Sequence, residues 1–236
     1  MADPEASGPF YESRWFKGTA AVVALLVSLA ALSLPLRGAL DDLFSASDLP
    51  RVETEIVFDR GSNMNAPFGD SDMTKLEWAK QDVARTAIPY EQEGLALRTF
   101  GGGCATPGNL LVDFGANHGD DVTKEVNSFH QGPSQSDSDL STAVKSAIDD
   151  FAELPSDTVK QVIVYVGTLN QCGQTSEQAA SDIRSFMLDK GVKPQFKFIG
   201  VDLSPAEKQQ LQDFKSVLPT LSVIPSGGAT GQDGQS

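Results

Sequence analysis

The chain has 236 residues and 40% hydrophobic content, which is enough for one ordinary domain with a packed core plus tails. Thirty-two acidic residues against eighteen basic ones give a formal net charge of −14 at pH 7. Because such a charge repels phosphate backbones, the composition argues against nucleic-acid binding.

The first element in chain order is an uncharged apolar run at residues 18–36, GTAAVVALLVSLAALSLPL. A helix of this length, at about 1.5 Å per residue, can cross a hydrocarbon core of about 30 Å. We therefore predict one N-terminal transmembrane helix at 18–36. A cleaved signal peptide is the alternative, but its apolar region is usually only about 7–15 residues long, and no small-x-small cleavage site directly follows this run.

Charges beside the apolar run indicate its orientation. Arg14 and Lys17 precede the run, and only Arg37 follows it closely. By the positive-inside rule, this excess favours a cytoplasmic N-terminus and an extracytoplasmic C-terminal domain in a single-pass protein of the cell membrane. Residues 1–17 are then a cytoplasmic tail, and residues 37–50 a juxtamembrane linker.

Beyond the linker, short apolar segments alternate with segments whose apolar residues recur every three or four positions. This alternation predicts right-handed crossovers and a doubly wound, mostly parallel α/β sheet flanked by helices. A short loop joins two of the strands, 94–100 and 109–115, so we expect these two to pair in antiparallel fashion. The first expected strand ends at Asp59, and the others cover 94–100, 109–115, 161–167 and 195–201. The expected helices cover about 73–88, 139–153, 175–189 and 204–216.

The folded domain is expected to cover residues 51–224. Two of its helix starts, at Thr175 and Ser204, carry the Ser/Thr-x-x-Glu/Gln pattern of a capping box. Residues 225–236, PSGGATGQDGQS, contain too few apolar groups to offset the entropy of ordering, so we expect a disordered C-terminal tail there.

Five stretches occur in a characteristic order: IVFDRGSNM, LALRTFGGGC, SDSDLSTAVKSAI, VIVYVGTLNQCG and FKFIGVDLSPAEKQQLQ. Their arrangement resembles the von Willebrand factor type A (vWA) family over nearly the whole domain. The resemblance implies a Rossmann-like fold and a role in protein binding or adhesion. In such sheets, ligands bind outside the carboxyl ends of the strands.

The hallmark of the vWA family is an adhesion site in which D-x-S-x-S, a threonine and a further aspartate hold Mg²⁺ or Mn²⁺ through oxygen atoms. The leading aspartate falls on Asp59, the two serines fall on Gly61 and Asn63, the threonine falls on Ser138, and the last aspartate falls on Gly167. A single carboxylate then neutralises most of the charge of an ion that loses its water reluctantly. The resemblance thus implies a degenerate site with no functional metal.

Two of these residues also have plain structural interpretations. Asp59 is expected to hydrogen-bond the backbone amides of its own turn, and Ser138 to cap the helix at 139–153. The alternative is a residual Mg²⁺ or Mn²⁺ site made by Asp59, Asn63 and Ser138 with water molecules. In either case, the predicted binding rim consists of Asp59, Gly61, Ser62, Asn63, Ser138 and Gly167.

The chain has just two cysteines, Cys104 and Cys172. An oxidising compartment would allow them to join, although two unrelated thiols remain the alternative because sequence alone does not fix a pairing. Both follow carboxyl ends of expected parallel strands, where they could meet. The vWA resemblance also implies a pair, because bacterial relatives often carry cysteines in similar loops.

No catalytic constellation is present in the sequence. The two histidines, His118 and His130, stand in loop-like contexts, and there is no G-x-S-x-G elbow or H-E-x-x-H pair. We therefore expect no enzyme, but a membrane-anchored domain that binds an unidentified protein. The alternatives are a metal-dependent adhesion domain and a scaffold subunit of an envelope complex in which the membrane helix makes contacts.

Overall fold

The computed structural model describes residues 51–87, 93–104, 108–130, 139–169, 172–218 and 220–226. Chain contacts separate Met1–Leu49 from a compact unit at Pro50–Ser236, which contains all of the described residues. The predicted transmembrane helix at 18–36 and the segments on either side of it lie outside this described part. Within the described part, every helix is too short or too polar to span a bilayer.

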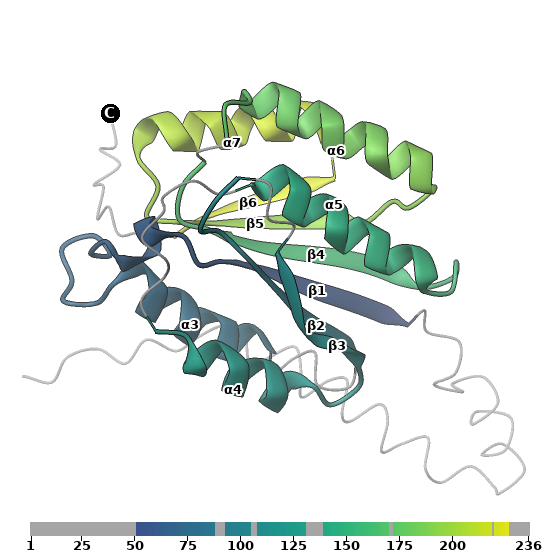
Figure 1. The fold of residues 1–236 in the computed structure, drawn as a ribbon, viewed down its shortest axis with the longest axis horizontal. Helices are drawn as coiled ribbons and strands as arrows, with labels where there is room; N and C mark the ends of the chain where they lie inside the picture. The colour runs from purple at the N-terminus through teal and green to yellow at the C-terminus, as the bar shows by residue number, and fades with distance from the viewer. Residues whose placement is uncertain are drawn as a thin grey trace, which may run out of the picture. The chain divides into compact units, whose positions relative to one another are not determined.

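A six-stranded sheet forms the centre of the domain, in the order β3-β2-β1-β4-β5-β6 (Figure 1). All neighbouring strands are parallel except β2 and β3, which are antiparallel as predicted. The predicted fold class, a mostly parallel doubly wound sheet, is therefore confirmed. The strands are β1 Val52–Asp59, β2 Gly94–Phe100, β3 Asn109–Gly115, β4 Val159–Val166, β5 Gln195–Val201 and β6 Leu221–Ser226.

Helices cover both faces of this sheet (Figure 1). One face carries α3 Lys75–Ala87 and α4 Gly119–Ser128, and the other carries α5 Leu140–Asp150, α6 Ser176–Lys190 and α7 Pro205–Val217. Short 3-10 turns lie at Ser62–Asn65 (η3) and Phe151–Glu153 (η5). Helix α4 and strand β6 were not predicted, and β6 continues into the segment that was expected to be a tail.

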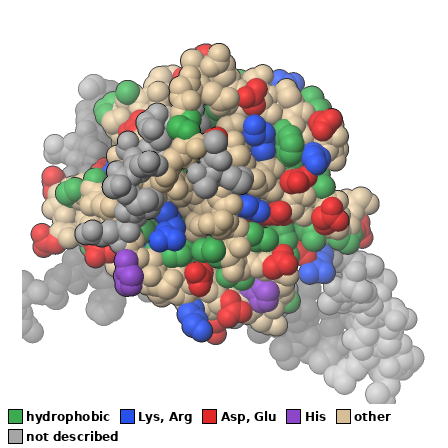
Figure 2. Space-filling model, in the orientation of Figure 1, with side chains coloured by type: hydrophobic (Ala, Val, Ile, Leu, Met, Phe, Trp, Pro, Cys, Tyr) green, Lys and Arg blue, Asp and Glu red, His purple; other side chains and the backbone are tan. Residues whose placement is uncertain are grey.

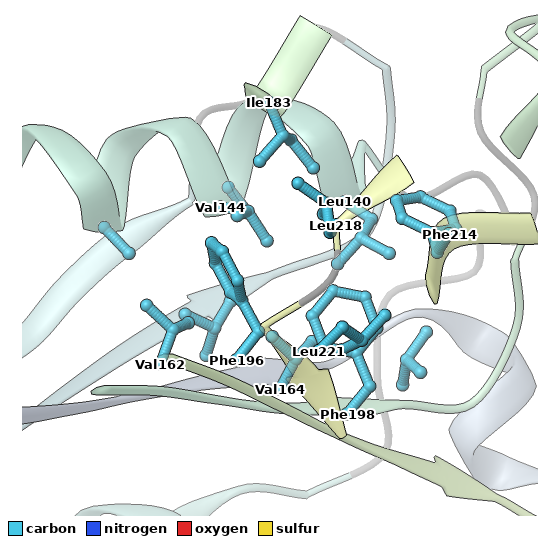
Figure 3. Packing of buried hydrophobic residues seen from close by; sticks show 14 of the residues in the cluster. Leu140, Val144, Val162, Val164, Ile183, Phe196, Phe198, Phe214, Leu218 and Leu221 are labelled. Carbon is cyan, nitrogen blue, oxygen red and sulfur yellow. The ribbon is translucent and has the colours of Figure 1, made fainter. Parts of the chain in front are cut away.

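The alternation of side chains along β1 assigns its residues to two apolar layers. Ile56 and Phe58 pack under α3 and α4, whereas Val57 packs with α5, α6 and α7. Figure 3 shows how the second layer is filled by side chains from β4, β5 and the three helices, among them Val164, Phe198 and Phe214. Both layers exclude water, which fixes the ends of β1 and β4 in place.

The helix starts follow the sequence closely. Thr175 and Ser204 form the two predicted capping boxes, with Gln178 and Glu207 as the reciprocal partners. At α5, the cap is Asp139, whose side chain accepts a hydrogen bond from the backbone N–H of Thr142 at 2.9 Å. The prediction that Ser138 caps this helix was therefore wrong by one residue, because the carboxylate already satisfies the first turn.

Candidate functional site

The carboxyl ends of β1, β2 and β4 bring three loops together at one edge of the sheet. We call the described residues of these loops the rim: Asp59–Met64 after β1, Gly101–Cys104 after β2, and Gly167–Leu169 with Cys172 after β4. Of the six predicted rim residues, the structure places Asp59, Gly61, Ser62, Asn63 and Gly167 here. Ser138 lies outside the described residues.

Asp59 is the central residue of the rim and is fully buried. Its Oδ1 accepts a hydrogen bond from the backbone N–H of Gly61 at 2.7 Å, and its Oδ2 accepts one from the backbone N–H of Gly167 at 3.0 Å. The first bond is the Asx-type turn expected from the sequence. The second joins the loop after β1 to the loop after β4, so one carboxylate holds two loops in register.

Two rim glycines lie in close packing, one against the backbone and Asp59 and the other against Met64. A Cβ added at Gly101, where φ is +103°, would lie 2.5 Å from the backbone nitrogen of Gly61 and 2.9 Å from Oδ1 of Asp59. A Cβ added at Gly167 would lie 2.3 Å from the sulfur of the fully buried Met64. Met64 therefore fills the space into which a side chain at position 167 would project.

A cation lies beside the same loop. The side-chain ammonium of Lys75, the first residue of α3, donates a hydrogen bond to the carbonyl oxygen of Gly167 at 3.4 Å. The lysine is half-buried, and its backbone N–H donates to the carbonyl of Ala66 at 2.9 Å. Sequence reasoning missed Lys75, since its contact with Gly167 spans 92 positions and no local pattern marks it.

Arg60 adds a second cation at the rim. Its backbone N–H donates to the carbonyl of Phe100 at 2.7 Å, and its guanidinium carbon lies 4.3 Å from the centre of the Phe129 ring, in cation–π geometry. The Nε atom of Arg60 is buried and has no hydrogen-bond partner in the described part of the chain. The stretch after β1 thus presents a buried carboxylate followed directly by a partly exposed guanidinium.

The loop after β4 is also tied to the start of α7. Oε1 of Glu207 accepts hydrogen bonds from the Thr168 hydroxyl at 2.9 Å and from the backbone N–H of Leu169 at 3.3 Å. Although burial raises the pKa of this carboxyl, the hydrogen bonds from Ser204, Thr168 and Leu169 outweigh burial and hold the pKa of Glu207 below its ordinary value. A shallow polar hollow of about 400 Å³ lies here, between the starts of α6 and α7.

Cys104 and Cys172 form the predicted disulfide, with 5.6 Å between their Cα atoms. The bond joins the loop after β2 to the loop after β4, and β1 lies between these two strands in the sheet. The covalent link therefore joins the loops that follow the two strands on either side of β1.

The two histidines lie apart from the residues around Asp59. Nδ1 of His118 is hydrogen-bonded to the carbonyl of Asp113 at 2.8 Å, near the start of α4, and His130 is exposed just beyond the end of that helix. The described residues also contain no group of three or more histidines, cysteines, aspartates or glutamates arranged to hold a metal ion.

No family model and no curated protein sequence matches the chain. An aerotolerance-related membrane protein from Bacteroides fragilis is 15% identical, and the match covers 74% of this chain and 91% of that chain with a TM-score of 0.55. The SpRpn10 VWA domain is 14% identical over 74% of this chain and 88% of that chain, with a TM-score of 0.51.

A third solved structure, proximal thread matrix protein 1 from the mussel byssus, is described with a zinc-occupied MIDAS motif. It is 15% identical over 75% of this chain and 44% of that chain, with a TM-score of 0.52. At such identities, the similarity establishes the fold. The domain has the vWA fold that its sequence resembles.

Proposed function

We propose that this chain is a single-pass membrane protein whose extracytoplasmic vWA-fold domain binds another protein through the rim, without a divalent ion. The observation that carries the proposal is the state of Asp59, whose two oxygens accept hydrogen bonds from the amides of Gly61 and Gly167. This bonding makes the rim a fixed surface on which neighbouring side chains are positioned for a partner.

The chemistry of the rim argues against a bound Mg²⁺ or Mn²⁺. Gly61 and Gly167 offer no side-chain oxygen, and hard divalent ions need several oxygen ligands. Met64 occupies the space beside Gly167, and the ammonium of Lys75 brings a positive charge to the same loop. These residues do not fit the ion that vWA domains with a complete motif carry.

A metal titration tests this part of the proposal. Mg²⁺ and then Mn²⁺ would be titrated into the purified full-length protein in detergent, with heat and thermal midpoint as the two measurements. We expect no heat and no change of midpoint at millimolar ion. A saturable signal that is lost in Asp59→Ala would overturn the metal-free proposal in favour of a residual site.

Membrane anchoring is supported by the apolar run at 18–36 and by a fold shared with a protein described as a membrane protein. Carbonate extraction of native membranes and protease treatment of intact cells test it. We expect the chain to stay with the membrane fraction and the C-terminal domain to be cleaved from outside. Recovery of the chain in the soluble fraction would contradict an anchor.

Partner binding through the rim can be tested by site-specific photo-crosslinking in native membranes. We would place the crosslinker at Ser62, which is half-buried in the rim, and at Asp157, which is exposed just before β4 at the opposite end of the sheet. A protein captured from position 62 and not from 157 supports rim docking. Capture that depends instead on the sequence of 18–36 supports a scaffold role for the membrane helix.

A further inference from the structure

The rim carries two half-buried cations, Lys75 and Arg60. Neither pairs with a carboxylate in the described part of the chain, whereas Arg51, Arg85, Arg98 and Lys190 each do. Figure 2 shows Asp and Glu side chains scattered over the viewed face among Lys and Arg side chains. In a chain with a net charge of −14, these two cations place positive charge at the rim.

The ammonium of Lys75 has a fixed position and unused hydrogen-bonding capacity. It can donate three hydrogen bonds, and only the one to the Gly167 carbonyl is present among the described residues. The acid on the other side of Gly167 is Asp59, whose oxygens accept the two backbone amides. The lysine charge is therefore held at the rim by a neutral carbonyl.

Arg60 also has unused hydrogen-bonding capacity. Its guanidinium lies on the ring of Phe129, and its buried Nε donates to no acceptor in the described part of the chain. The guanidinium of Arg60 therefore carries a positive charge at the rim that no carboxylate of the described residues neutralises.

We propose that the rim receives a carboxylate of the partner protein directly on the Lys75 ammonium, with Arg60 as a second cation that attracts acidic surfaces. The inference rests on the proposed function and names the partner chemistry: an Asp or Glu side chain. A carboxylate complements an ammonium with a short, charge-assisted hydrogen bond. Such binding weakens with salt and needs no divalent ion.

Binding of an acidic peptide tests the inference without knowledge of the partner. Fluorescein-labelled hexaglutamate and hexaglutamine would be titrated into the full-length protein in detergent with EDTA present, and anisotropy measured. We expect hexaglutamate alone to bind, and Lys75→Gln to weaken it at least tenfold. Lys75→Arg, which keeps the charge, should bind within about threefold of the native protein, because an arginine also donates to carboxylates.

The chain offers a matched control in Lys160. This lysine is also half-buried and also donates to a backbone carbonyl, that of Pro155 at 2.9 Å, but it lies at the opposite end of the sheet. Lys160→Gln removes the same charge and should leave hexaglutamate binding unchanged. Equal weakening by both variants would show a general charge effect and overturn the inference.

The inference and the proposed function can fail separately. Unchanged hexaglutamate binding in Lys75→Gln, or binding that requires Mg²⁺, overturns the role of Lys75. If the crosslinker at Ser62 still captures a protein in that case, rim docking itself stands. If Lys75→Gln lowers the thermal midpoint strongly, the native protein and Lys75→Arg are both treated to acetylate their lysines, and hexaglutamate binding is measured again. Loss of binding in the acetylated native protein but not in acetylated Lys75→Arg supports the inference. Loss of binding in both overturns it.

Discussion

Two buried carboxylates on the same face of β1 are stabilised in different ways. At the rim, Asp59 accepts hydrogen bonds from two backbone amides. In the middle of the strand, Glu55 is equally buried, and its Oε1 accepts a hydrogen bond from Nε of Arg98 at 2.8 Å. Arg98 also pairs with Asp150 of α5, and Arg51 pairs with Glu53.

The cations beside Glu55 are paired with carboxylates, whereas the cations at the rim are not paired with carboxylates among the described residues. Around Glu55, the arginines Arg98 and Arg51 pair with acids of the same chain. Burial raises the pKa of Glu55 to about 8, against the lowering effect of the Arg98 guanidinium. At the rim, two backbone amides stabilise the carboxylate of Asp59 in place of an arginine. The cations Lys75 and Arg60 can therefore bind another molecule.

Removal of Arg98, which pairs with Glu55 and Asp150, is expected to have the largest effect on stability. At pH 9, Glu55 of the native protein is ionised beside Arg98. In Arg98→Met, the buried carboxyl must either keep its charge without a cation or take up a proton at a pH where the unfolded chain is ionised, and both cost stability. We expect a loss of about 3–5 kcal/mol in the free energy of unfolding at pH 9, measured by urea denaturation. The double variant Arg98→Met with Glu55→Leu should recover most of it, since an apolar pair replaces the charges. A loss below about 1 kcal/mol in the single variant would contradict this account.

Removal of the disulfide acts on the rim alone. The bond closes a loop with a sequence separation of 68, and replacing both Cys104 and Cys172 by serine should lower the free energy of unfolding by about 2–4 kcal/mol. Thermal unfolding with and without dithiothreitol measures the effect. The reductant should shift the native protein toward the double variant and leave the variant unchanged. Equal midpoints for both proteins under oxidising conditions would show that the bond adds no stability.

Asp59→Asn tests how much the rim depends on one carboxylate. The amide oxygen of asparagine can still accept one backbone N–H, but its NH₂ group faces the other. We expect a loss of about 2 kcal/mol, because hydrogen bonds to a charged group contribute about 1.5–3 kcal/mol. Urea denaturation measures it, with Asp157→Asn as a control at an exposed loop position. An unchanged midpoint in Asp59→Asn would mean that the two loops are held by other contacts.

The pH dependence of stability also concerns Glu55, and its slope per pH unit is small. Because its pKa in the folded state lies above its ordinary value of 4.5, the folded protein holds this proton more tightly than the unfolded chain does. The resulting stabilisation is complete below about pH 4.5 and is lost as the pH rises to about 8. In this window, Glu55 lowers the free energy of unfolding by at most about 1.4 kcal/mol per pH unit, a slope that Glu55→Gln should remove.

Most of the fold was predictable because its elements carry strong local signals. The strands at 94–100, 109–115 and 195–201 match their predicted bounds, as apolar runs between turns define them. Helix α4 was missed because only Val122 and Val126 of its ten residues are fully buried apolar side chains. Strand β6 is a short edge strand that contains Pro225, a residue that weakens any sequence pattern for a strand.

The site was predictable only where sequence neighbours decide it. The bond from Gly61 to Asp59 follows from a turn of three residues. The cysteine pair was expected on other grounds, because the chain has just two cysteines and the vWA resemblance implies a pair. The contacts of Lys75 and Met64 with Gly167, and of Arg98 with Glu55, join distant positions of the chain. Such contacts depend on how helices and strands pack, and a single sequence carries no local pattern for them.

The carboxylate of Asp59 also has a consequence for amide exchange in heavy water. The N–H groups of Gly61 and Gly167 belong to loops, where amides normally exchange quickly, yet both donate to a fully buried acceptor. Their exchange requires the two loops to separate, and the bond between Cys104 and Cys172 opposes that motion. In the oxidised protein, these two protons should therefore be retained as long as those of the central strands, and reduction should release them first.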